Sequence, residues 1–298
     1  MIEEIQALKK ERRATILAHN YQLPEVQDVA DLVGDSLELS RAAARLDSEV
    51  IIFCGVDFMA ETAAILSPHK CVVIPEKGAW CPMAHMITPD QLDDLKALNP
   101  GAAVVCYVNS TAEIKAKSDI CCTSANGVQV VNSLAQEEVI FVPDRNLAAY
   151  VARHTDKKII PWNGYCYVHD HFTPAEVKAA RALHPGAEVL VHPECRPEVI
   201  DEADFVYSTA GMGKHAKASD AREFIIGTEV GMIYRLTKEN PSKEFYPLRE
   251  NAVCQNMKKT TLEKVLGALQ TLEPRVTVPE EVAAKARRAI ERMLAVHI

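Results

Sequence analysis

Short apolar runs rich in β-branched residues, such as ATILA, AAVVCYV and AEVLV, alternate along the chain with longer segments of helical periodicity. Runs that are apolar on both faces are typical of strands in a parallel sheet covered by helices on each side. In the first part of the chain we predict strands at 15–18, 31–33, 50–54 and 71–74. Strands that alternate with helices indicate βαβ units, so the pattern predicts an α/β protein.

An internal repeat divides the chain. ITPDQLDDLKALNPGAAVV and FTPAEVKAARALHPGAEVL match at an offset of 85 residues, and a third copy aligns near the N-terminus. We predict repeats at 1–84, 85–170 and 171–260, followed by C-terminal helices at 261–298. Units this small should pack against one another. The expected fold is three homologous αβα sandwich domains with parallel sheets, in a pseudo-threefold arrangement around a central active site.

Several helix starts are marked by capping residues. Thr88 and Thr173 each precede a proline, and a Gln or Glu three residues later completes a capping box. The stretch TTLE, from Thr260 to Glu263, predicts a further capping box. The segment PEEVAAKARRAIERMLAV predicts a C-terminal helix.

Polar residues recur at matching positions after the first three strands of each unit, and one cysteine follows the fourth strand. In parallel α/β sheets, ligands bind beyond the carboxyl ends of the strands, so these side chains should share one rim. The rows are His19, Tyr107 and His192; Tyr21, Asn109 and Glu194; Ser36, Ser124 and Thr209; Asp57, Asp144 and Glu229; and Cys81, Cys166 and Cys254.

The three matched cysteines are candidate metal ligands. The chain has nine cysteines, an odd number that no complete disulfide framework can use. A local Cys166–His169 site would lack a second ligand pair, but inward-facing rims would bring Cys81, Cys166 and Cys254 to one axis. Three thiolates leave one coordination position open, as a Lewis-acid catalyst requires. Spacing does not separate zinc from an iron–sulfur cluster.

The other cysteines have no threefold counterparts. Four of the six lie in apolar strand runs and are expected to fill the core, whereas Cys195 follows Glu194 on the rim. Of the histidines in GYCYVHDH, His169 is expected to support the ligands or the substrate, and His171 to lie on the surface.

Two further rows have structural interpretations. Asp31, Asp119 and Asp204 are expected to hold each unit together as turn or cap residues. The Ser/Thr row has helix N-capping as an alternative role. Helix N-termini aimed at the axis would suit carboxylates or phosphate.

Composition narrows the classes of partner. The net charge is −8 and no basic stripe stands out, which argues against nucleic acid or an anionic membrane. The N-terminal stretch MIEEIQALKKERR is charged, and no apolar run approaches the ~20 residues of a membrane span. We expect a cytoplasmic protein.

The motifs resemble those of the quinolinate synthase family. LAHNYQLPEVQDVADLVGDS, GVDFMAE, CPMA, YVNSTAE, CTSAN, PDRNLA, HPEC, IGTEVGM and CQNMKK follow the family's order from about residue 14 to residue 265. The resemblance implies condensation of iminoaspartate with dihydroxyacetone phosphate to quinolinate, phosphate and water, in NAD biosynthesis. It also implies a [4Fe–4S] cluster held by Cys81, Cys166 and Cys254, and a functional link to L-aspartate oxidase or dehydrogenase.

The resemblance also implies roles for the rim residues. Acid–base steps would fall to Tyr21, Glu194 and His192. The substrate pocket would be lined by His19, Ser36, Tyr107, Asn109, Ser124, His192, Glu194 and Thr209.

The chain departs from the family pattern in two places. Three residues after Cys254 stands Met257, where some relatives carry a second cysteine, so a disulfide between these two positions is excluded. Tyr165 stands where a histidine is common before the cysteine.

Two rival functions stay open. One is a zinc-dependent or cysteine-nucleophile enzyme acting on a phosphorylated metabolite, and the other is a triplicated binding module without catalysis.

Overall fold

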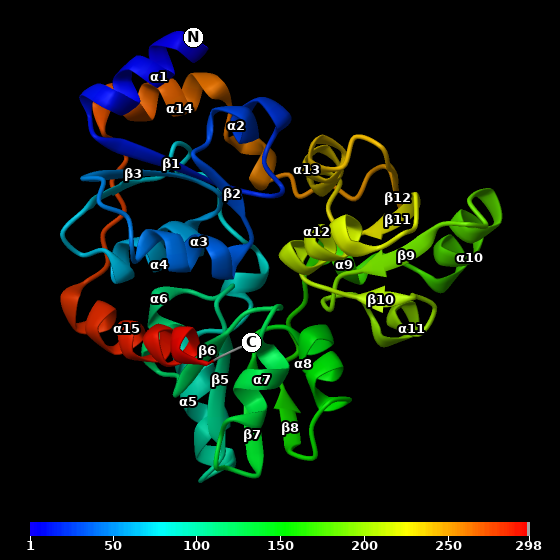
Figure 1. Cartoon of the computed structure of the whole chain (residues 1–298). Helices are drawn as coiled ribbons and strands as arrows, with labels where there is room; N and C mark the ends of the chain where they lie inside the picture. Colours follow the sequence, from blue (N-terminus) through cyan, green and yellow to red (C-terminus); the bar gives the residue numbers. More distant parts are fainter. Residues whose placement is uncertain (297–298) are drawn as a thin grey trace.

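Three parallel sheets form the framework of the molecule (Figure 1). The computed structural model describes residues 1–296, and within them each sheet has four strands with only parallel pairs. The strand orders are β2-β1-β3-β4, β6-β5-β7-β8 and β10-β9-β11-β12, which are one topology repeated three times. With helices between the strands, the predicted α/β class with three αβα units is confirmed.

The strands coincide with the apolar runs. The predictions at 15–18, 31–33, 50–54 and 71–74 each match a strand to within one residue at either end. The strands are β1 Ala14–His19, β2 Leu32–Gly34, β3 Val50–Cys54, β4 Cys71–Val73, β5 Ala103–Tyr107, β6 Ile120–Cys122, β7 Glu138–Val142, β8 Lys158–Pro161, β9 Glu188–Val191, β10 Phe205–Val206, β11 Glu223–Gly227 and β12 Glu244–Pro247.

Helices flank the sheets. In Figure 1, α1, α2 and α14 lie on one face of the first sheet, and α3 and α4 lie on the other. The helices are α1 Ile2–Glu11, α2 Pro24–Val29, α3 Ser36–Ala43, α4 Asp57–Leu66, η1 Met83–His85, α5 Pro89–Leu98, α6 Ala112–Ala116, α7 Gly127–Asn132, α8 Arg145–Ala152, α9 Tyr167–Asp170, α10 Pro174–Leu183, α11 Pro197–Ile200, α12 Thr209–Ala218, α13 Gly231–Glu239, η2 Met257–Lys259, α14 Leu262–Thr271 and α15 Glu280–Ala295.

The C-terminal helices are shared between two units. Helix α14 packs on α1 and β3, whereas α15 packs on α6, β6 and α4 and so joins the first and second units. A row of buried small and apolar residues, including Ala286 and Ile290, lets α15 lie close to its neighbours. Of the predicted segment 261–298, residues 297–298 lie outside the described residues. The boundaries at 84/85, 170/171 and 260/261 stay a prediction.

Two of the three predicted capping boxes are confirmed. Thr88 and Thr173 accept the N–H of the third helical residue, whose side chain bonds back to the cap. The prediction for Thr260 is wrong. Helix α14 starts one residue later, so Thr261 is its cap and accepts the Lys264 N–H. Thr260 instead ends η2 and is buried.

A repeated aspartate joins the first two strands of each unit. The carboxylates of Asp31, Asp119 and Asp204 accept the backbone N–H groups of Ile16, Val104 and Val189 at 2.8, 2.8 and 2.7 Å. Each aspartate also donates its own N–H to the carbonyl of the same residue. The structural role predicted for this row is confirmed, but the aspartates act by joining two strands and not as turn or cap residues.

Five of the six cysteines without threefold counterparts are buried, and Cys71, at the start of β4, is partly buried. Cys54, Cys106, Cys121 and Cys122 are fully buried in β3, β5 and β6, as expected for core residues. Cys195 is also fully buried, below the rim.

Along residues 1–296 no helix has the length and apolar character to cross a membrane.

Candidate active site

One pocket lies where the carboxyl ends of the three sheets meet. The twelve residues predicted to act in catalysis, substrate binding or metal binding all line it, four from each repeat. They are His19, Tyr21, Ser36, Cys81, Tyr107, Asn109, Ser124, Cys166, His192, Glu194, Thr209 and Cys254. The structure thus brings together residues that lie up to 235 positions apart (254 − 19 = 235).

Each matched cysteine lies just before or at the start of a short helical turn. Cys81 precedes η1, Cys166 caps α9 and Cys254 precedes η2. The backbone N–H of each donates to the acidic residue after the third strand of its own unit. The distances are 3.0 Å for Cys81 to Asp57, 3.2 Å for Cys166 to Asp144 and 3.1 Å for Cys254 to Glu229. The recurring acidic row therefore holds the cysteine loops.

The three thiols line the same pocket. Burial raises the pKa of Cys166, and the neighbouring Glu194, Cys81 and Cys254 raise it further. Burial likewise raises the pKa of Cys81, and Cys254 adds to it. A thiol with a raised pKa keeps its proton, so a metal bound here must displace protons from sulfur.

A chain of short polar contacts runs from the first unit to the third. The Tyr21 hydroxyl lies 2.6 Å from Thr228 Oγ1, which lies 2.8 Å from His169 Nε2. On the other side of the ring, His169 Nδ1 lies 2.6 Å from Glu194 Oε2 and 3.2 Å from Cys166 Sγ. These atoms form a continuous path for a proton beside one of the cysteines.

Glu194 is a buried carboxylate with two imidazole neighbours. Burial alone would raise its pKa, but His169 and His192 outweigh burial and hold the pKa well below its usual range. Burial raises the pKa of Tyr21, and Glu194 adds to the effect, so the phenol stays protonated. Glu194 is therefore an acceptor and Tyr21 a donor at neutral pH.

His19 and His192 are held in the same way in two units. The Nδ1 atom of His19 accepts the Tyr21 N–H at 3.2 Å, and that of His192 accepts the Glu194 N–H at 3.3 Å. Burial, with His192 and Lys258 nearby, lowers the pKa of His19 to about 3, and burial and His169 lower that of His192. Because Nδ1 of each ring accepts an N–H, the ring proton lies on Nε2, where it can donate to an anionic ligand.

Two buried acceptors in the pocket lack partners among residues 1–296. They are Glu194 Oε1 and Asn109 Oδ1. Because buried polar atoms in folded proteins are nearly always hydrogen-bonded, these oxygens are suited to donors on a bound molecule.

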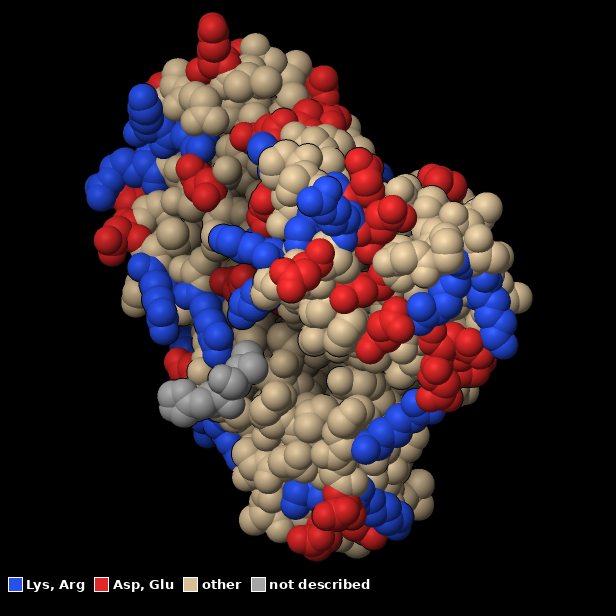
Figure 2. Space-filling model, turned by 45° about the vertical axis from the view of Figure 1, so that its right-hand side comes forward, with Lys and Arg blue, Asp and Glu red and all other residues tan. Residues whose placement is uncertain are grey.

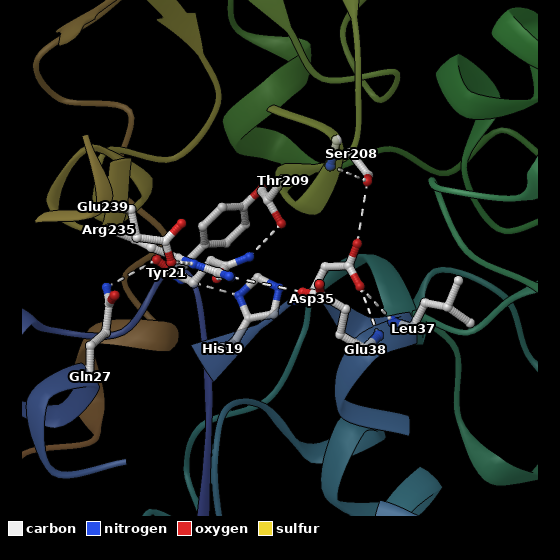
Figure 3. Close-up of polar contacts among 12 residues, drawn as sticks. His19, Tyr21, Gln27, Asp35, Leu37, Glu38, Ser208, Thr209, Arg235 and Glu239 are labelled. Carbon is white, nitrogen blue, oxygen red and sulfur yellow. Dashed lines mark hydrogen bonds and ion pairs between the residues drawn. The ribbon is translucent and has the colours of Figure 1, made fainter. Parts of the chain in front are cut away.

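The Ser/Thr row does not cap helices by its side chains. The N-cap residues of α3 and α12 are Asp35 and Ser208, one position before Ser36 and Thr209. The two caps contact each other across the units, with Ser208 Oγ donating to Asp35 Oδ2 at 3.3 Å (Figure 3). The capping interpretation is wrong because Asp35 and Ser208 take that place, and Ser36 and Thr209 line the pocket instead.

Comparison with known proteins identifies the family. The family described as "Quinolinate synthetase A protein" matches residues 3–295. The chain is 61% identical to a quinolinate synthase of Methanoregula boonei, over 98% of this chain and 97% of that protein. It is 59% identical to one of Dehalococcoides mccartyi strain CBDB1, with the same coverage. It is 56% identical to "Quinolinate synthase 1" of Methanosarcina acetivorans, over 100% of this chain and 98% of that protein.

The chain belongs to the quinolinate synthetase A family. It is therefore an enzyme that acts on small molecules. The rival function as a binding module without catalysis is not supported. Donor atoms of Cys166, His169 and Glu194 lie within 4.8 Å of one another, so this member of the family has a cluster of side chains able to hold a metal.

One residue of the chain of polar contacts was missed from the sequence. Thr228 directly follows β11 and links Tyr21 to His169. It immediately precedes Glu229 of the recurring acidic row, and its place at a strand end was the available signal. The sequence predicts a supporting role for His169, and the structure places it at the centre of the chain of polar contacts. His171 is exposed, as expected.

A groove lies beside the inner pocket. It has a volume of about 470 Å³, lies between α3, α7 and α12, and shares Asp35 and Ser124 with the inner pocket. Arg41 and Lys214 lie along it. Figure 2 shows a hollow near the middle of one face of the molecule. Asp35 and Glu38 also line the groove, so its charged side chains are of both signs.

Proposed function

We propose that the protein is a quinolinate synthase that condenses iminoaspartate with dihydroxyacetone phosphate to quinolinate, phosphate and water, in the de novo synthesis of NAD. The observation that carries the proposal is the meeting of one cysteine from each unit with the Tyr21–Thr228–His169–Glu194 chain in a single pocket. The function requires both a metal centre and groups that move protons, and this pocket has candidates for each.

The donor set suits a [4Fe–4S] cluster held by Cys81, Cys166 and Cys254. Thiolates are the usual protein ligands of such clusters, and all three cysteines line the same pocket. Three cysteines would bind three of the four irons and leave the fourth iron without a protein ligand. When bound, the cluster would supply a Lewis-acid site for substrate oxygens.

Proton transfer is assigned to Tyr21, Glu194 and His192. Tyr21 is a protonated phenol whose proton can be replaced through Thr228 and His169. Glu194 orients His169 through Nδ1, and its free oxygen can accept an N–H or O–H of the substrate. His192 presents a neutral imidazole N–H to the pocket. Positioned groups of this kind contribute roughly 10²–10⁴-fold to rate.

Substrate binding is assigned to the other pocket residues. Iminoaspartate carries two carboxylates and its partner a phosphate, so donors are needed. Neutral His19 and the hydroxyls of Ser36, Tyr107, Ser124 and Thr209 supply donors, and the N-termini of α3 and α12 add favourable dipoles. The Asn109 amide adds an N–H donor and an unpaired oxygen.

A zinc enzyme acting on a phosphorylated metabolite is the second candidate. It is favoured by one observation, because Cys166, His169 and Glu194 also form a ligand combination that zinc accepts. Metal and sulfide analysis of anaerobically purified protein separates the two, since only a cluster contains sulfide.

The decisive experiment is a quinolinate assay with both substrates on the reconstituted protein. We expect quinolinate and a brown protein from the natural sequence, and neither from Cys166→Ser. A colourless Cys166→Ser variant with full activity would refute the ligand assignment. The expected supply of iminoaspartate by L-aspartate oxidase or dehydrogenase, and the cytoplasmic location, stay predictions.

A further inference from the structure

The recurring acidic row has no role in the proposed proton transfer. Asp57, Asp144 and Glu229 each follow the third strand of their unit, and each accepts the backbone N–H of the cysteine 22 to 25 positions later. The same contact occurs three times in units that otherwise differ in sequence, which argues against coincidence.

The carboxylates themselves are firmly held. Asp144 also accepts the N–H groups of Asn146 and Leu147, both at 2.8 Å. Glu229 accepts the Gly231 N–H at 2.8 Å and lies 2.9 Å from the Lys258 ammonium. Each carboxylate therefore ties a cysteine loop to the start of the helix that follows the third strand.

Asp57 has the simplest surroundings. One oxygen accepts the Cys81 N–H at 3.0 Å, and the other lies 2.7 Å from His85 Nε2. Its side chain is 27% exposed, whereas the Glu229 side chain is fully buried. Replacing Asp57 therefore disturbs the cysteine loop with the least effect on the core.

We propose that Asp57, Asp144 and Glu229 are positioning residues that hold the three cysteine loops in place and so slow the loss of the metal centre. This inference rests on the proposed cluster at Cys81, Cys166 and Cys254. Groups that orient metal ligands through hydrogen bonds commonly change metal affinity by roughly 10–100-fold when removed. The role needs only an acceptor oxygen at each cysteine amide.

The test compares Asp57→Ala with Asp57→Asn and with Asp31→Ala. Asp31 is a matched control in the same unit, because its carboxylate also accepts one backbone N–H and contacts one basic side chain, Lys9. Asp31 lies at the second strand of the sheet and makes no contact with a cysteine loop among the described residues. Each protein is reconstituted anaerobically, and three quantities are measured: the iron and sulfide content, the rate of iron loss to a ferrous chelator, and the Tm of the metal-free form.

We expect Asp57→Ala to lose iron about tenfold faster than the natural protein. Asp57→Asn, which keeps an acceptor oxygen, and Asp31→Ala should lose iron at nearly the natural rate. Equal rates for Asp57→Ala and the natural protein, or equal acceleration by Asp31→Ala, would overturn the inference while leaving the cluster assignment intact. A natural protein that binds no iron and sulfide would overturn the proposed function and this inference with it. If Asp57→Ala does not fold, Asp57→Leu takes its place, because leucine keeps the approximate size of the side chain but has no acceptor oxygen for the Cys81 N–H. Equal rates of iron loss from Asp57→Leu and Asp57→Asn would then overturn the inference.

Discussion

Glu194 holds a charge in a pocket with little contact with water. Its side chain is 4% exposed, and two histidine rings lie beside it, stacked on each other at 4.5 Å between ring centroids. Such a carboxylate is stable only because His169 donates to it and the Glu194 N–H fixes His192. The two rings therefore act differently on Glu194: His169 donates from Nδ1 to the carboxylate, whereas His192 accepts the backbone N–H at Nδ1.

Thr228 is the residue that should reveal the proton path. Thr228→Val keeps the shape of the side chain but removes the hydroxyl between Tyr21 and His169. We expect kcat for quinolinate formation to fall roughly 10²-fold with a small change in KM. Thr228→Ser keeps the hydroxyl and should retain most of the activity. An active Thr228→Val enzyme would show that protons reach Tyr21 by another route.

His19 makes stability depend on pH. Its pKa is lowered to about 3 by burial, so between that value and the usual pKa near 6.5 the unfolded chain binds more protons than the folded protein. Stability should therefore fall as the pH falls through this window, by up to about 1.4 kcal/mol per pH unit from this group. The lowered pKa of His192 acts in the same direction. Thermal unfolding from about pH 4 to about pH 6.5 should show a shallower dependence for His19→Asn, and an unchanged slope would contradict this assignment.

At the scale of elements, each unit begins with a βαβ segment whose two strands are joined by an aspartate side chain. Asp119 joins the start of β6 to β5 in the second unit, and Asp31 and Asp204 make the corresponding contact in the other two. The contact recurs because parallel neighbours β5 and β6 are linked through α6, and the carboxylate binds an N–H near the strand start. Strand positions follow from local apolar runs, which is why the sequence predicted them well.

Removing one of these aspartates should destabilise its unit. Asp119→Ala leaves the Val104 N–H without its side-chain acceptor, and we expect a loss of about 1–3 kcal/mol of stability. Asp119→Asn keeps an acceptor oxygen and should lose less. Thermal unfolding measures both variants, and identical Tm values for Asp119→Ala and the natural protein would contradict the structural role of this row.

At the scale of the whole molecule, the site exists only because three units meet. Figure 1 shows the three sheets pointing toward a common centre. The first and third units are joined there by Asn20, which donates to Thr209 at 2.6 Å and accepts from Arg235 at 2.5 Å. Figure 3 shows Thr209 and Arg235 approaching the residues of the first unit from the third.

Asn20 should therefore affect both assembly and substrate binding. Asn20→Ala leaves Arg235 without a buried acceptor and frees Thr209, so we expect a lower Tm and a higher KM. Asn20→Asp keeps an acceptor for Arg235 but loses the donor to Thr209, so its Tm should lie closer to that of the natural protein. Calorimetry and steady-state kinetics measure the two effects. A normal Tm and KM in Asn20→Ala would show that other contacts hold the units together.

The sequence by itself determined the α/β class, the threefold repeat and the rows of polar residues at strand ends. These follow from apolar periodicity and from the rule that parallel strands present their carboxyl ends at one edge, both of which act within a single unit. Rows such as Cys81, Cys166 and Cys254 could therefore be found without knowing how the units pack.

Only the tertiary structure decided which of those residues touch. The contact of Tyr21 with Thr228 joins residues 207 positions apart, and the pairing of Ser208 with Asp35 spans 173. Such contacts depend on how one unit is rotated and placed against another, and no local pattern records that placement. The same holds for the pKa of Glu194, because burial and two neighbouring histidines set it only after the pocket has formed.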